Sequence, residues 1–164
     1  MNAKDALRNN LAFTKNFVSR ALSDLSDADL LVRPVPGANH IAWQLGHVIS
    51  SERGMFSKNL SGDNYPELPA GFAERHSKEN AASQDTKGWG TKAEYLALFN
   101  KVRDTTIAAL DRLPEADLDK PVVGPASRIA STMGELFALA SNHALMHTGQ
   151  FSVVRRTLGK PIFM

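Results

Sequence analysis

The feature that most constrains the fold is a long amphipathic pattern near the C-terminus. Between residues 133 and 158, apolar side chains recur every three or four positions, which indicates one face of an α-helix. The stripe comprises Leu136, Ala140, His143, His147, Phe151, Val154 and Leu158. We expect one helix of roughly 39 Å, at a rise of about 1.5 Å per residue. A helix of this length needs other elements against which to bury its apolar face.

Two histidines, His143 and His147, interrupt this apolar stripe. Side chains four positions apart lie one above the other on a helix, so both imidazoles point inward and can approach one ion. A buried imidazole needs a partner for its polar nitrogens, and the apolar neighbours on the stripe offer none. The partner therefore lies elsewhere in the chain or is a metal ion, for which histidine is the commonest protein ligand.

Three further stretches repeat the helical period. We expect helices over residues 2–25, 40–60 and 91–112. Asn39 is the expected N-cap of the second, and a capping-box pattern from Thr91 to Glu94 opens the third, which stops before Pro114. Four helices that each have one apolar face, with no convincing strand, predict an all-α four-helix bundle in which residues 1–164 form one domain.

A long connection separates the second and third expected helices. Residues 61–90 carry clusters of Gly, Pro, Asn, Ser and Asp with little periodicity, and we expect one helical turn near residues 72–76. Loops of more than about 15 residues without regular structure are uncommon in compact domains and often cover functional sites. This connection is therefore a candidate wall of the site.

His47 adds a third imidazole to the pair. It adjoins the apolar stripe of the second expected helix, one turn after Trp43. A set of three histidines leaves coordination positions open for water or substrate, as a catalytic metal centre requires. The alternative is that His47, His143 and His147 are core histidines satisfied by hydrogen bonds. Their spacing and the lack of cysteine favour the metal interpretation.

Other polar residues near these histidines are weaker candidates. His40 falls in the first turn of its helix, where side chains are usually exposed, and His76 lies in a charged segment where we expect it to be solvated. Gln44 and Gln150 could orient a ligand water or a substrate, although a surface glutamine is the commoner case. Glu52 is the nearest candidate for a general base, but we expect a solvated surface carboxylate.

Composition narrows the function classes. The 164 residues include no cysteine, so disulfides, thiolate nucleophiles and Cys-ligated zinc are excluded and any metal must use N and O ligands. The formal net charge is only +2, and the longest basic run is the pair Arg155 and Arg156, which we expect to face the negative end of a helix dipole. No nucleic-acid partner is expected. With neither a membrane-spanning stretch nor a signal-peptide pattern, we expect a cytoplasmic protein without a membrane partner.

Two motifs resemble the DinB/YfiT-like superfamily. They are Trp-x-x-x-His, from Trp43 to His47, and His-x-x-x-His-x-Gly-Gln, from His143 to Gln150. The resemblance extends over most of the chain, including the order and lengths of the four expected helices.

The resemblance implies a four-helix bundle, often a homodimer, that binds a divalent metal ion, most often zinc or nickel. It places the metal ligands at His47, His143 and His147, one on the second helix and two on the last. Relatives include bacillithiol S-transferases and mycothiol-dependent maleylpyruvate isomerases. The latter carry a His, Glu, His pattern, from which His143 departs, so their activity is not carried over.

These observations lead to two hypotheses of different classes. The first is a metal-dependent enzyme, similar to a thiol S-transferase or a hydrolase, that acts on a small-molecule substrate such as a low-molecular-weight thiol. The second is a non-catalytic, stress-related or structural helical bundle that binds a metal or a partner without turnover. Neither the residues nor the resemblance assigns a catalytic residue.

Overall fold

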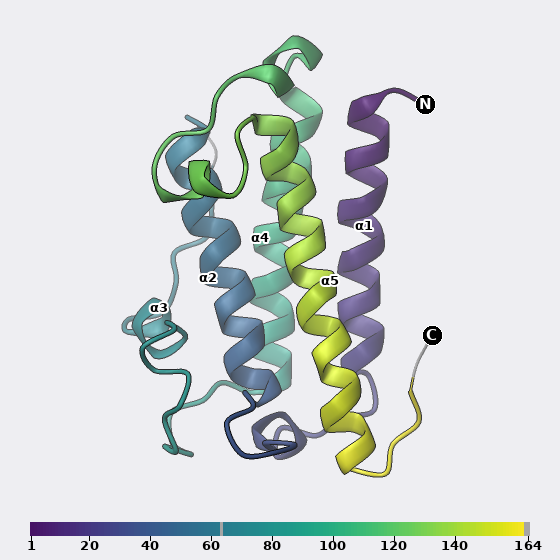
Figure 1. Cartoon of the computed structure of the whole chain (residues 1–164), viewed down its shortest axis with the longest axis vertical. Helices are drawn as coiled ribbons and strands as arrows, with labels where there is room; N and C mark the ends of the chain where they lie inside the picture. The colour runs from purple at the N-terminus through teal and green to yellow at the C-terminus, as the bar shows by residue number, and fades with distance from the viewer. Residues whose placement is uncertain (63, 163–164) are drawn as a thin grey trace.

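Four long helices form a bundle in the computed structural model, which describes residues 1–62 and 64–162 (Figure 1). They are α1 (Ala3–Leu22), α2 (Ile41–Asn59), α4 (Lys92–Arg112) and α5 (Met133–Thr157). Within the described residues there is no β-strand, only an isolated bridge between Pro121 and Thr132. The predicted all-α four-helix bundle is confirmed.

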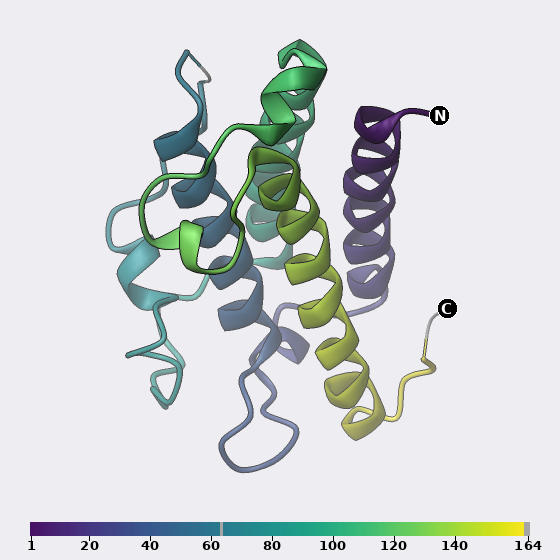
Figure 2. The ribbon, with the colours of Figure 1, turned by 45° about the horizontal axis from the view of Figure 1, so that its top comes forward.

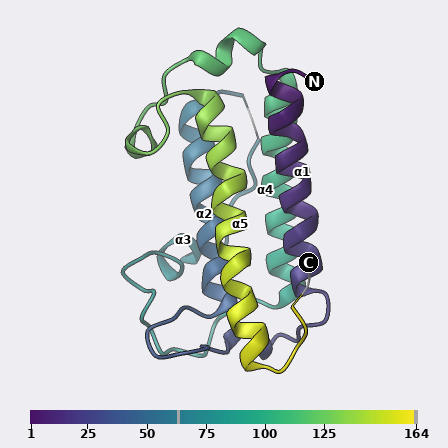
Figure 3. The ribbon, with the colours of Figure 1, turned by 45° about the vertical axis from the view of Figure 1, so that its right-hand side comes forward.

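Each helix packs against two neighbours. α1 and α2 each contact both α4 and α5, so the four helices form a closed ring around one apolar core (Figure 3). The expected stripe of α5 faces this core: Leu136, Ala140, Phe151 and Val154 are buried. None of the described helices combines the length and the apolar character needed to cross a bilayer.

The direction of the helices explains the long connection. α1 and α5 run down the view of Figure 1, whereas α2 and α4 both run up. Because α2 and α4 are parallel, the chain must return along the whole of α2, roughly 28 Å at 1.5 Å per residue, before α4 begins. The returning segment carries the short helix α3 (Phe72–Arg75) and lies along the outside of α2. The helical turn expected near residues 72–76 is therefore present.

Local hydrogen bonds set the helix ends. α4 begins as predicted, with Thr91 and Glu94 in a reciprocal capping box. α2 begins one residue later than expected, because Nδ1 of His40, and not Asn39, accepts the hydrogen bond from the Trp43 N–H at 3.1 Å. α1 ends at Leu22 rather than at residue 25, where the chain turns away into the loop that leads to the 3₁₀ helix η1 (Asp29–Leu31).

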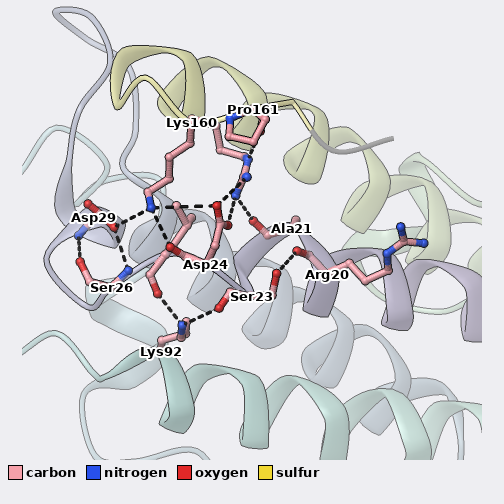
Figure 4. Close-up of polar contacts among 11 residues, drawn as sticks. Arg20, Ala21, Ser23, Asp24, Ser26, Asp29, Lys92, Lys160 and Pro161 are labelled. Atoms are coloured by element: carbon pink, nitrogen blue, oxygen red, sulfur yellow. Dashed lines mark hydrogen bonds and ion pairs between the residues drawn. The ribbon is translucent and has the colours of Figure 1, made fainter.

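Charged side chains hold that loop against two other helix ends (Figure 4). Arg155 of α5 forms a 2.6 Å ion pair with Asp24, and Nζ of Lys160 donates to the Asp24 carbonyl at 2.7 Å. At the start of α4, Nζ of Lys92 donates to the carbonyls of Ser23 and Leu25. Arg155 lies in the last turn of α5, near the negative end of the helix dipole as expected. Its burial and its pairing with a carboxylate were not predicted.

The connector between α4 and α5 contains two 3₁₀ helices, η2 (Glu115–Asp119) and η3 (Pro125–Arg128). It reaches across to the C-terminal end of α2 (Figure 2). The Asn59 side chain fastens it there, since its Oδ1 accepts a hydrogen bond from the Val123 N–H at 2.8 Å. The connector therefore lies at one end of the α2–α5 pair, whose side chains form the candidate site.

Candidate metal centre

Three histidines from two helices meet between α2 and α5. His47 projects from α2, and His143 and His147 project from successive turns of α5. One ring nitrogen from each lies within 4.8 Å of the others. Nε2 of His143 and Nε2 of His147 are 3.1 Å apart. The structure thus brings together all three predicted site residues; their role as metal ligands stays a prediction.

His147 is oriented by a buried glutamine on α2. Its Nδ1 lies 3.1 Å from Oε1 of Gln44, whose amide nitrogen donates to the Asn39 carbonyl at 2.9 Å. The amide oxygen is therefore the acceptor, and Nδ1 of His147 carries the proton. The lone pair on Nε2 faces His143. Gln44 is buried, not the surface residue that we expected.

His47 is oriented in the same way by a backbone carbonyl. Its Nδ1 lies 3.3 Å from the carbonyl oxygen of His76, which can only accept a hydrogen bond, so Nδ1 is the protonated nitrogen. The indole of Trp43 stacks on the other side, with ring centroids 4.9 Å apart and an interplanar angle of 6°. The connection expected to form a wall of the site thus supplies an atom that bonds one of the three histidines.

The donor set fits a divalent metal ion. Two nitrogens bonded to one tetrahedral ion at ~2.0–2.1 Å are roughly 3.4 Å apart, close to the spacing of the His143 and His147 nitrogens. In the metal-free chain, Nε2 of His143 must donate to Nε2 of His147, because the latter is the unprotonated nitrogen. To bind an ion through Nε2, the neutral His143 ring would have to carry its proton on Nδ1 instead, because only an unprotonated ring nitrogen binds metal.

Burial keeps all three imidazoles neutral near pH 7. Loss of solvent, together with the smaller effect of the neighbouring imidazoles, lowers the pKa of His143 to about 4 and that of His147 to about 3. Burial also lowers the pKa of His47, and the charge of Lys78 adds to this shift. Neutral imidazole is the form that binds metal.

The other two histidines were wrongly expected to be exposed. His40 is 3% exposed and His76 is 1% exposed. His40 caps α2 and packs edge-on against Trp89. The His76 ring is held by the Phe72 carbonyl at Nδ1 and by the Tyr95 hydroxyl at Nε2, at 2.7 and 2.8 Å. As predicted, neither imidazole belongs to the cluster of three. Both rings are buried, however, which was not predicted.

Glu52 was also wrongly expected to be solvated. It is 1% exposed and accepts three hydrogen bonds from the guanidinium of Arg103, at 2.9, 3.2 and 2.8 Å. Arg103 itself is fully buried and also donates to the carbonyls of Leu11 and Ala140. Glu52 therefore joins the helices of the bundle and is not free to act as a base. Among the described residues, the group that could hold a metal consists of histidines alone.

A cavity of about 840 Å³ lies elsewhere, between the 61–90 connection and α4. Phe72, His76, Trp89 and Tyr95 line it, and the three clustered histidines do not. Both tryptophans pack against histidine rings, Trp43 against His47 and Trp89 against His40 and His76.

The fold and the cluster define a class of protein: a helical bundle with a candidate three-histidine metal centre between two of its helices. The chain belongs to the DinB superfamily, whose family description matches residues 11–151. No curated protein gives a significant match.

Two solved structures share the fold. One is YfiT from Bacillus subtilis, described as a probable metal-dependent hydrolase with an unusual four-helix bundle topology; it is 16% identical, with a TM-score of 0.69 over 96% of this chain and 89% of that one. The other is a conserved protein from Enterococcus faecalis, 19% identical, with a TM-score of 0.66 over 98% of this chain and 99% of that one. At these identities the likeness shows the fold, including the four-helix bundle, and not the activity.

Proposed function

We propose that this protein is a divalent-metal-dependent enzyme whose ion is held by His47, His143 and His147. One observation carries the proposal: a nitrogen of each of the three neutral imidazoles lies within 4.8 Å of the others. The hydrogen bonds at Nδ1 of His47 and His147 support it, because they leave Nε2 of both rings free as a ligand.

Three nitrogen ligands leave coordination positions for a substrate or water. A bound divalent ion would supply Lewis acidity there, lowering the pKa of a thiol or a water so that it is a nucleophile near neutral pH. Zinc or nickel is the proposed ion, since imidazole suits both. The protein's own part is to orient the rings, through Gln44 and the His76 carbonyl, and to limit solvent around them.

The proposed substrate is a small molecule. It is either a low-molecular-weight thiol, in a transfer reaction, or a compound with a hydrolysable bond, in a hydrolysis reaction. Lys78 supports an anionic reacting group, since its positive charge lies close enough to lower the pKa of both His47 and His143. The description of YfiT as a probable metal-dependent hydrolase is consistent with the second reaction.

A non-catalytic metal-binding bundle is the second candidate. It is favoured by the lack of a carboxylate in the cluster among the described residues, since Glu52 is engaged by Arg103. A metal-loaded protein that turns over neither thiol nor hydrolysable substrates would favour this candidate. The homodimer and the cytoplasmic location remain predictions.

The test is elemental analysis of protein purified without an affinity tag and incubated with Zn²⁺ or Ni²⁺. We expect about one equivalent of metal per chain in the wild type, lost in His143→Ala. Asn142→Ala, at an exposed position of the same helix, is the control and should keep the metal. Failure of the folded wild-type protein to retain either metal would contradict the proposal.

A further inference from the structure

His76 is buried although it lies in a polar, charged segment of the chain. Its ring has a hydrogen-bond partner at each nitrogen, the Phe72 carbonyl at Nδ1 and the Tyr95 hydroxyl at Nε2. The carbonyl must accept, so Nδ1 carries the proton and the Tyr95 hydroxyl donates to Nε2. The ring is therefore fixed in one orientation, between α3 and α4.

The ring occupies a slot on α2 that exists because residue 46 is glycine. A Cβ atom at Gly46 would lie 2.0 Å from Cδ2 and 2.2 Å from Nε2 of His76, distances that no real contact allows. Gly46 is inside a helix and has no positive φ, so its backbone does not require glycine. Glycine weakens a helix interior relative to alanine. The contact with His76 is the structural reason for it here.

The same segment bonds two neighbouring rings of α2 through consecutive carbonyls. The His76 carbonyl faces Nδ1 of His47 at 3.3 Å. The next carbonyl, that of Ser77, accepts from Nε1 of Trp43 at 3.1 Å, and the Trp43 indole stacks on His47. The position of the segment therefore determines which nitrogen of His47 is protonated.

We propose that His76 is a positioning residue for His47: its ring, seated against Gly46, holds its carbonyl where it selects the tautomer of His47 with Nε2 free to bind metal. The metal-binding part rests on the proposed function. The tautomer part does not, because the contacts are those of the metal-free chain. A hydrogen bond to the second nitrogen of a metal-bound histidine commonly changes metal affinity by 10- to 100-fold.

The test compares Gly46→Ala with Gly54→Ala. Both glycines lie inside α2, but a Cβ at Gly54 has nothing within 4 Å. The first readout is the tautomer of His47 in the metal-free protein, from long-range ¹H–¹⁵N NMR of the imidazoles. We expect Nδ1–H in the wild type and in Gly54→Ala, and a mixture of tautomers in Gly46→Ala. The second readout is the dissociation constant for Zn²⁺, expected to rise at least tenfold in Gly46→Ala alone.

Each outcome decides the inference. A His47 protonated at Nε2 in the wild type, or a Gly46→Ala protein with wild-type tautomer and zinc affinity, would overturn it. The expected tautomers without zinc binding in any protein would uphold the positioning role while the proposed function fails. If Gly46→Ala does not fold, His76→Ala, which removes the ring and keeps the carbonyl, is measured in its place, with the same results expected and the same results overturning.

Discussion

At the scale of single residues, the candidate site depends on groups that never touch the proposed ion. The Gln44 amide is aligned by the Asn39 carbonyl and in turn aligns His147. For His47, the corresponding acceptor is a backbone carbonyl. A ligand held at its second nitrogen does not have to be ordered when the metal binds, so we expect these contacts to raise metal affinity without adding a ligand.

Removal of the Gln44 acceptor should weaken metal binding. Gln44→Leu keeps the approximate size of the side chain but leaves Nδ1 of His147 without its partner. We expect the dissociation constant for Zn²⁺ to rise by about 10-fold or more, measured by competition with a chromophoric chelator. Gln84→Leu changes an exposed glutamine and serves as the control. Equal affinities in the two variants would contradict the role assigned to Gln44.

The three histidines could be grouped from their positions in the sequence, but the burial of the residues around them could not be predicted. His143 and His147 share a helix face, which spacing predicts directly. The partners of Glu52 and His147 lie 51 and 103 residues away, respectively, on other helices. The local periodicity of the sequence gives no information on such distant partners. Glu52 and Gln44 were therefore predicted to be surface residues. Gly46, next to His47, is a feature of the sequence that could have indicated close packing of the 61–90 connection against α2.

At the scale of the elements, a buried network around Arg103 joins the four helices. The guanidinium on α4 bonds Glu52 of α2, the Leu11 carbonyl of α1 and the Ala140 carbonyl of α5. Both charged side chains are almost wholly buried, 0% and 2% exposed. Buried pairs of this kind are costly to break, because removal of one partner leaves an unpaired charge in the core.

Glu52→Ala should therefore destabilise the bundle strongly. We expect the free energy of unfolding to fall by about 3–5 kcal/mol, measured by urea denaturation. Asp111→Ala removes the partner of Arg8 in an exposed pair between α4 and α1, and should cost no more than about 1 kcal/mol. Similar decreases in the free energy of unfolding of both variants would show that the buried pair contributes no more to stability than the exposed pair.

Helix positions followed from periodicity, whereas helix directions did not. A stripe of apolar residues defines a face and two ends but gives no direction relative to the next helix. The parallel arrangement of α2 and α4 is set by the path of the 61–90 connection along α2. From its length, the connection was predicted to cover a functional site. Its length is also needed to return the chain along α2 to the start of α4.

At the scale of the whole molecule, buried histidines link stability to pH. Burial lowers the pKa of His40 and of His76 from 6.5 to about 4. Above pH 6.5 both are neutral in the folded and the unfolded chain. Between pH 6.5 and about 4 the unfolded chain takes up protons that the folded chain does not, so stability falls on acidification. His47, His143 and His147 act in the same direction.

We expect the metal-free protein to lose stability between pH 7 and pH 5. Each of His40 and His76 should contribute a slope of roughly 1.4 kcal/mol per pH unit below pH 6.5. Urea denaturation at several pH values measures it. His40→Asn keeps an N-cap acceptor but removes one titrating group, so its slope should be smaller by about one proton. A stability independent of pH over this range would contradict the neutral burial of these rings.

X-ray absorption spectroscopy of the zinc-loaded protein would count the imidazoles bound to the ion. We predict three imidazole nitrogens at ~2.0–2.1 Å, with the remaining positions filled by light atoms, and one imidazole fewer in His47→Ala. Two or fewer imidazoles in the wild type, or a spectrum unchanged in His47→Ala, would show that His47, His143 and His147 do not share one ion.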